Sequence, residues 1–123
     1  MHKIMLGLLC YVVATLTYAD NCDKTRNTYD DIYCTNKIYA SADADLNKNY
    51  QQLRHLLNET QQKILKKSQL AWIHYRDEQC SDDRQNSVDV QCRLSTTQER
   101  NQWLLERLRE CQTVGCKTTR LSE

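Results

Sequence analysis

Residues 68–80, SQLAWIHYRDEQC, gather the side chains that most suggest catalysis. A histidine acts as a general base when a second group orients it and a nucleophile lies within reach. Glu78 could orient His74 on a helix, but no Ser or Cys nucleophile accompanies the pair. His74 also lies two positions from both Trp72 and Arg76, so it shares a helix face with neither. We therefore interpret His74 as a solvent-facing helical residue.

Paired carboxylates are the second kind of catalytic group, because glycosidases use two of them. The close pairs are Asp30 and Asp31, Asp43 and Asp45, and Asp82 and Asp83. Side chains one or two residues apart on a helix point in different directions, and a pair in a loop is ordinary for a solvated turn. The sequence therefore predicts no catalytic residues, and we expect a protein that is not an enzyme and needs no cofactor.

A polar cluster is the third candidate site. Its predicted members are Asp43, Asn47 and Tyr50 on one helix and Gln69, Trp72 and Arg76 on the next. An antiparallel arrangement brings Arg76 to Asp43, and we predict an ion pair between them, with Asn47 and Gln69 hydrogen-bonded nearby. We expect a structural role, since polar groups inside a small bundle need partners and fix the register. A ligand or enzyme site built from the same groups is the alternative, and it would fail if no pocket lay beside the ion pair.

The elements that position these side chains are helical. Apolar residues recur every three or four positions in three stripes, at residues 32–57, 65–79 and 94–111, and each stripe indicates the inward face of a helix. The first stripe begins with Ile32, and the second includes Tyr75. Hairpin strands are not expected, because the chain has no Pro and only two Gly. The predicted fold is all-α: a small disulfide-stapled bundle of three main helices with a long antiparallel helical hairpin.

Local residues predict where the helices begin and end. Asn58 or Thr60 can cap the second helix, and Thr96 with Glu99 fits a capping box that starts the third. Gly115 lies just past the last stripe and suits a helix stop.

The N-terminus has the pattern of a secretory signal peptide. One Lys precedes an apolar run that is too short to span a bilayer, and small residues precede a cleavage site after Ala19. We predict a signal peptide at residues 1–19 and one periplasmic or secreted domain at residues 20–123. Without Lys3 the formal net charge is zero, so neither nucleic acid nor a membrane surface is favoured as a partner.

Six cysteines remain in that domain: Cys22, Cys34, Cys80, Cys92, Cys111 and Cys116. An even number in an oxidising compartment predicts three disulfides. A metal site is not favoured, because no Cys-x-x-Cys pair occurs. Cys111 lies at the far end of the bundle with only Cys116 nearby, so these two should pair.

The other four cysteines leave two pairings open. Folding the helical hairpin at about residue 58 places Cys34 closest to Cys80, and Cys22 then reaches the start of the third helix. This suggests Cys34–Cys80 and Cys22–Cys92. The alternative is Cys22–Cys80 with Cys34–Cys92.

Residues 81–91 carry no helical stripe and are predicted to form a loop between Cys80 and Cys92. The candidate contact residues for a protein partner are Asp82, Asp83, Arg84 and Asp89. A loop held at both ends is pre-organised, which lowers the entropy cost of binding. The alternative is a solvated connector.

Four groups of residues, in order along the chain, resemble one bacterial family. They are Cys22 and Cys34; Ala42, Asp43, Leu46, Asn47 and Tyr50; Gln69, Ala71, Trp72, Arg76, Asp77 and Cys80; and Cys92, Thr97, Arg100 and Leu104. The family is the lysozyme-inhibitor LprI-like N-terminal domain, and the resemblance covers nearly all of residues 20–123. The additional Cys111–Cys116 pair departs from the usual four cysteines.

The resemblance implies a small helical envelope protein, and for some members inhibition of lysozymes. We therefore expect a module that binds a lysozyme-like muramidase. The alternatives are a structural or stress-related envelope protein, or an immunity protein against a cell-wall-degrading toxin. Lysozymes are often basic, and this neutral chain offers only the local acidity of Asp77, Glu78, Asp82, Asp83 and Asp89.

Overall fold

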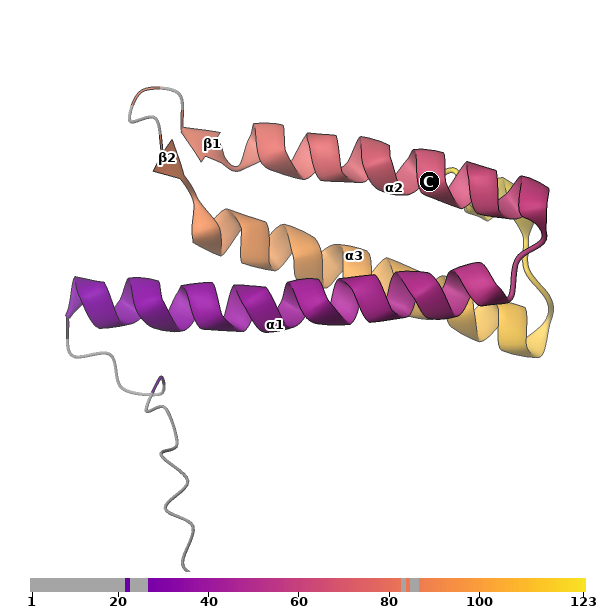
Figure 1. The fold of residues 1–123 in the computed structure, drawn as a ribbon, viewed down its shortest axis with the longest axis horizontal. Helices are drawn as coiled ribbons and strands as arrows, with labels where there is room; N and C mark the ends of the chain where they lie inside the picture. The colour runs from indigo at the N-terminus through magenta and orange to yellow at the C-terminus, as the bar shows by residue number, and fades with distance from the viewer. Residues whose placement is uncertain (1–21, 23–26, 83, 85–86) are drawn as a thin grey trace, which may run out of the picture.

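Three long helices make up most of the part of the chain that the structure describes (Figure 1). The computed structural model describes residue 22 and residues 27–82, 84 and 87–123, so the predicted signal peptide lies outside the described residues. The elements are α1 (Thr28–His55), α2 (Glu59–Gln79), β1 (Ser81–Asp82), β2 (Ser87–Val88), α3 (Val90–Thr113) and the 3-10 turn η1 (Thr118–Arg120). α2 runs antiparallel to α1 and α3 (Figure 1). The predicted all-α bundle with a helical hairpin is confirmed.

Side-chain caps set the start of each helix. Asn58 caps α2 with Gln61 as its capping-box partner, which is one of the two caps predicted. The predicted cap of α3 is wrong. Asp89 is the N-cap and accepts from the backbone N–H of Cys92 at 3.0 Å, whereas Thr96 lies inside the helix and donates to the Cys92 carbonyl at 2.8 Å. The helix therefore begins about two turns before the capping-box motif, because an earlier Asp offers a cap first.

A short hairpin replaces the predicted loop between α2 and α3. β1 and β2 pair antiparallel, with Ser81 opposite Val88. The backbone N–H of Asp89 donates to the Cys80 carbonyl at 2.8 Å and continues the pairing. The expectation that no strands occur is wrong, because a two-residue ladder needs little turn chemistry when a disulfide holds its base together.

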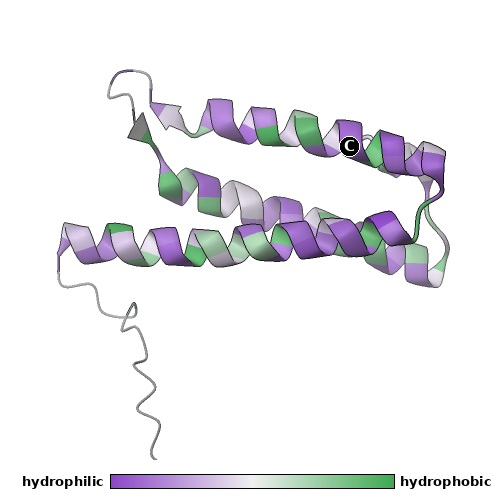
Figure 2. Cartoon of the chain, in the orientation of Figure 1, coloured by the Kyte–Doolittle hydropathy of each residue, from purple (hydrophilic) through white to green (hydrophobic). Residues whose placement is uncertain are grey.

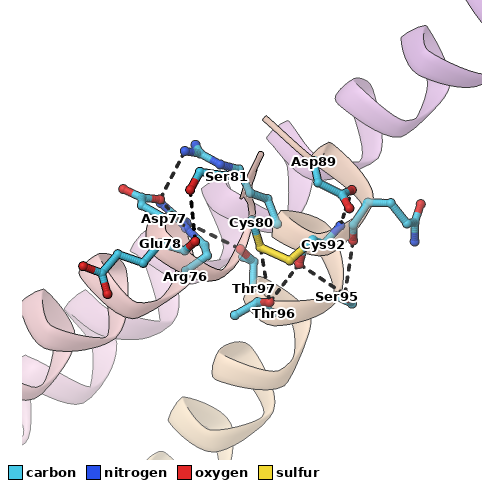
Figure 3. The surroundings of a disulfide bond; sticks show 12 residues. Arg76, Asp77, Glu78, Cys80, Ser81, Asp89, Cys92, Ser95, Thr96 and Thr97 are labelled. Atoms are coloured by element: carbon cyan, nitrogen blue, oxygen red, sulfur yellow. Dashed lines mark hydrogen bonds and ion pairs between the residues drawn. A yellow bond between two sulfur atoms is a disulfide. The ribbon is translucent and has the colours of Figure 1, made fainter. Parts of the chain in front are cut away.

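The disulfide at that base is Cys80–Cys92 (Figure 3). Cys22 pairs with Cys34. Both predicted pairings of these four cysteines are therefore wrong. The predicted pairings rested on the positions of the cysteines along straight helices. The hairpin was not expected, and it turns the chain back so that the Cα atoms of Cys80 and Cys92 lie 5.4 Å apart.

The third disulfide joins Cys111 and Cys116, the local pair that the sequence favours. It encloses the end of α3, where Gly115 has a φ of 99°. The backbone N–H of Gly115 donates to the Glu110 carbonyl at 2.9 Å, as expected of a glycine that ends a helix.

Leucines from all three helices and from the C-terminal residues make the core. Its fully or nearly buried members are Leu46, Leu53, Leu57, Leu65, Leu104 and Leu121. α3 packs more closely on α1 than on α2. There Asn101 donates to the Ala42 carbonyl at 3.0 Å and accepts from Asn49 at 3.2 Å. Polar and apolar residues alternate along the ribbons (Figure 2), so the apolar interior is narrow.

Three residues assigned to inward stripes are exposed instead: Ile32, Tyr75 and Gln79. Ile32 precedes the part of α1 that α3 covers, since the first turns of α1 extend past the start of α3 (Figure 1). On α2 the inward face carries Ser68, Gln69 and Arg76, which turns Tyr75 toward solvent. The helical period was right, but the buried face of α2 is more polar than an apolar stripe suggests.

Removing the Cys80–Cys92 disulfide should destabilise the fold. We expect the double substitution Cys80→Ser and Cys92→Ser to lower the free energy of unfolding by about 2–4 kcal/mol, because the unfolded chain regains the freedom of the closed loop. Denaturant unfolding followed by circular dichroism measures this, with Ser81→Ala as the control beside the bridge. A loss below about 0.5 kcal/mol would contradict the prediction.

Candidate functional site

Arginine and aromatic side chains alternate through the interior between the helices. We call this the arginine–aromatic column; in order, its members are Tyr39, Arg76, Trp72, Arg100, Trp103 and Arg107. Successive guanidinium carbons lie 5.9, 5.1, 5.8, 3.7 and 5.5 Å from the neighbouring ring centroids. All three arginines are buried. Contacts of this kind stabilise a cation more when water is excluded.

Arg76 joins this column to the predicted polar cluster. Its Nη1 lies 3.6 Å from Asp43 Oδ1, so the expected ion pair is present. Nε donates to Asp77 Oδ1 at 3.1 Å, and Nη1 contacts Thr97 Oγ1 at 3.5 Å (Figure 3). Arg93 also reaches Asp77, at 3.3 Å. Arg76 thereby links α1, α2 and α3.

Gln69 has a different partner from the one expected. Its Oε1 accepts from Arg100 Nε at 3.0 Å, whereas Asn47 is exposed on α1. The predicted hydrogen bonding of Asn47 and Gln69 beside the ion pair is therefore wrong. Sequence spacing placed Gln69 on the correct face but did not foresee that an arginine of α3 occupies that face.

A groove of ≈ 440 Å³ lies beside the Asp43–Arg76 pair, between α1 and α2. Five members of the predicted cluster line it: Asp43, Asn47, Tyr50, Gln69 and Arg76. Its lining has one carboxylate and no His, Ser or Cys, which suits binding better than bond cleavage. In the part of the chain that the structure describes, no cluster of three His, Cys, Asp or Glu residues could hold a metal.

Arg100 is a buried member of the interior polar network. Nε donates to Gln69, Nη2 donates to Ser68 Oγ at 2.8 Å, and Nη1 donates to the backbone oxygen of Glu123 at 3.2 Å. Burial lowers the pKa of Arg100 to about 10, because the charged form loses solvation. The guanidinium still carries its charge at neutral pH.

The loop proposed for partner contact forms one end of the molecule. We call this the hairpin end: the first turns of α1 and the β1–β2 hairpin. Asp82 is exposed and accepts from the backbone N–H of Arg84 at 3.1 Å. Asp89 is engaged as the cap of α3, and Asp83 lies outside the described residues. With Asp77 also paired to two arginines, this end is less acidic than the sequence suggested.

Sequence reasoning missed an exposed apolar surface at the same end. Tyr29, Ile32 and Tyr33, which we call the tyrosine patch, are 78%, 54% and 53% exposed. Their i, i+3 and i+4 spacing is visible in the sequence, but only Ile32 was assigned, as the start of a buried stripe. The buried arginines at positions 100 and 107 were also missed, although both lie near the apolar face of α3.

Most of these elements lie within the part of the chain that matches a known family. Residues 19–104 match the family described as Lysozyme inhibitor LprI. The chain belongs to this lysozyme-inhibitor family. The LprI match spans α1, α2, the hairpin and the first part of α3, and stops before the C-terminal residues. Proteins of the LprI family are inhibitors rather than enzymes.

Part of the chain is also similar to a curated protein. An uncharacterized protein of Rhizobium meliloti is 34% identical over 73 residues, which cover 49% of this chain and 52% of that protein. The match thus spans about half the length of the relative. No solved structure matches. Within the described residues, no helix is long and apolar enough to cross a membrane. The LprI family and the disulfides indicate a location outside the cytoplasm.

Proposed function

We propose that this protein is a periplasmic or secreted inhibitor of a lysozyme-like muramidase. The observation that carries the proposal is the LprI match over residues 19–104. In this proposal the mature domain is residues 20–123, and the hairpin end covers the cleft in which the enzyme binds its glycan. The protein needs no catalytic group for this role, because exclusion of substrate is enough.

The hairpin end suits such a contact because disulfides constrain its described residues at two points. Cys80–Cys92 closes the base of the hairpin, and Cys22 is bonded to Cys34 in the second turn of α1. Rigid surfaces lose little conformational entropy when they bind. The tyrosine patch adds large amphipathic side chains of the kind that often carry binding energy in protein interfaces.

Electrostatic attraction should contribute little to affinity. The contact proposed from the sequence includes Asp82, Asp83, Arg84 and Asp89, of which Asp89 already caps α3. We expect the combined Asp82→Asn, Asp83→Asn and Asp89→Asn variant to bind a basic muramidase about threefold to tenfold more weakly at low salt, mainly through a slower association rate. The difference should shrink at high salt. Surface plasmon resonance at two ionic strengths measures it, and unchanged affinity at low salt would remove the acidic contact.

The proposed function is tested directly with a panel of lysozymes. The mature protein is immobilised and offered envelope extract and purified muramidases, and cell-wall lysis is followed in the presence of the free protein. Saturable capture with loss of lysis supports inhibition. If no muramidase is captured and no lysis is prevented, the inhibitor proposal fails, and a structural or stress-related envelope role gains support. Capture of a cell-wall-degrading toxin alone would favour the immunity role.

A further inference from the structure

The last residues of the chain, residues 117–123, occupy a cleft between α2 and α3. We call them the strap. They follow the positive-φ glycine Gly115, turn through η1 and lie against α2 (Figure 1). The strap lies beyond residue 104, where the LprI match ends. We propose that this cleft is a binding site for an acidic peptide segment of a partner protein, and that the strap is its resident occupant.

The cleft binds Glu123 through two oxygen atoms. The backbone oxygen accepts from Ser68 Oγ and Arg100 Nη1, both at 3.2 Å. The carboxylate Oε2 accepts from Arg107 Nη1 at 3.2 Å. Ser68, Arg100 and Arg107 are all buried, whereas Glu123 is exposed. The receptor groups thus belong to the interior of the helical bundle, and the glutamate that they bind is exposed.

Leu121 is the apolar anchor of the strap. It is 1% exposed and belongs to the leucine core. Around it, Arg120 Nη1 lies 2.7 Å from Glu110 Oε1, and Gln61 Nε2 donates to Thr118 Oγ1 at 3.0 Å. The cleft therefore recognises a leucine followed, two residues later, by a glutamate.

The charge of the cleft favours an anionic occupant. Within the described residues, no Asp or Glu side chain forms a salt bridge with Arg100, whose hydrogen bonds go to Gln69, Ser68 and the Glu123 backbone oxygen. A buried cation is stabilised by a nearby anion. A peptide carboxylate at this position would meet a charged guanidinium that is already oriented by Ser68 and Gln69.

The strap does not fill the cleft. A cavity of ≈ 540 Å³ lies between the strap and α2, with Ile64, Lys67 and Ala71 on the helix side and Thr119 and Ser122 on the strap side. A peptide with larger apolar side chains at the positions of Thr119 and Ser122 would bury more surface there. Burial of each additional CH₂ group adds about 0.8 kcal/mol.

This extra burial matters because a partner competes with a tethered segment. An attached strap acts at an effective concentration on the order of millimolar, so a free peptide of the same sequence should hardly displace it. A partner segment that also fills the cavity gains contacts that the strap lacks. The site is therefore selective for a better-fitting acidic segment.

The experiment uses two fluorescent peptides and the full mature chain. One peptide has the strap sequence TTRLSE, and the second carries Thr119→Leu and Ser122→Leu in that sequence. The strap of the protein is weakened by Leu121→Ser with Glu123→Gln, and binding is read by fluorescence anisotropy. We expect the strap-weakened protein to bind TTRLSE at least about tenfold more tightly than the unmodified protein, and the leucine-substituted peptide more tightly still.

Two controls connect binding to the cleft. Adding Arg107→Gln to the strap-weakened protein should abolish binding, whereas Arg109→Gln, at an exposed position of α3, should not. A C-terminally amidated peptide shows whether the site binds only chain ends or also accepts internal segments. If tight binding requires a free C-terminal carboxylate, the site binds a chain end. If Leu121→Ser disturbs the helical circular dichroism, Glu123→Gln alone serves as the weakened strap.

The proposal is overturned if neither peptide binds saturably to a folded strap-weakened protein. It is also overturned if Arg107→Gln leaves binding unchanged. Because neither outcome involves a muramidase, the result is independent of the inhibitor proposal.

Discussion

Replacing Tyr29 and Tyr33 with alanine should weaken inhibition of the target muramidase by about 100-fold or more. Exposed tyrosines that become buried at an interface often contribute about 2 kcal/mol each, and the two lie on adjacent positions of one helix face. The fold should be retained, because both side chains are more than half exposed and alanine favours helix. The measurement is the inhibition constant in a lysis assay with the muramidase found by capture.

Tyr75→Ala is the matched control for this prediction. Tyr75 is 55% exposed, close to the value for Tyr33, but it lies on α2 outside the tyrosine patch. Its replacement should change inhibition less than threefold. Equal losses for Tyr75 and for the patch would place the contact elsewhere, and no loss for either would exclude the hairpin end.

Replacing Arg100 with alanine should lower the free energy of unfolding by about 3–4 kcal/mol. The change leaves Gln69 without its partner, removes a cation 3.7 Å from the Trp103 ring centroid and opens a cavity in the interior. A small domain is stable by only about 5–15 kcal/mol, so this is a large fraction of the total. Denaturant unfolding of the oxidised protein measures the loss.

Two further variants separate charge from geometry. Arg100→Lys keeps a cation but not the planar fork that reaches three acceptors, so we expect an intermediate loss of about 2 kcal/mol. Arg109→Ala, at an exposed position of the same helix, should cost less than about 0.5 kcal/mol. If Arg100→Ala were as mild as Arg109→Ala, the arginine–aromatic column would not stabilise the fold.

The helices and the Asp43–Arg76 ion pair were predictable because they depend on short-range spacing. A repeat of three or four residues identifies a helix, and a short connection fixes the antiparallel partner of α1. Contacts that depend on how α3 packs against the other two helices were not predictable in this way. Gln69 binds Arg100 of α3, and nothing in the α1–α2 register reveals where α3 lies.

The polar side chains on the buried faces of the helices were also not predicted. A stripe is recognised by apolar residues, yet the inward face of α2 includes Arg76 and that of α3 includes Arg100 and Arg107. These arginines are tolerated because tryptophan rings pack against them and each has polar partners. The partners of Arg76 and Arg107 include carboxylates, and those of Arg100 are neutral acceptors. The exposed position of Ile32 has the opposite cause: the helical period continues past the point where other helices cover α1.

The disulfide connectivity has a consequence for biosynthesis. Each of the six cysteines from Cys22 onward pairs with its neighbour in chain order: Cys22 with Cys34, Cys80 with Cys92, and Cys111 with Cys116. This is one of about 15 ways to pair six cysteines, and it is the set that forms if each thiol is oxidised with the preceding one as the chain emerges from its N-terminus. An oxidant that acts during translocation would therefore produce the native bonds directly, and maturation should proceed without a disulfide isomerase.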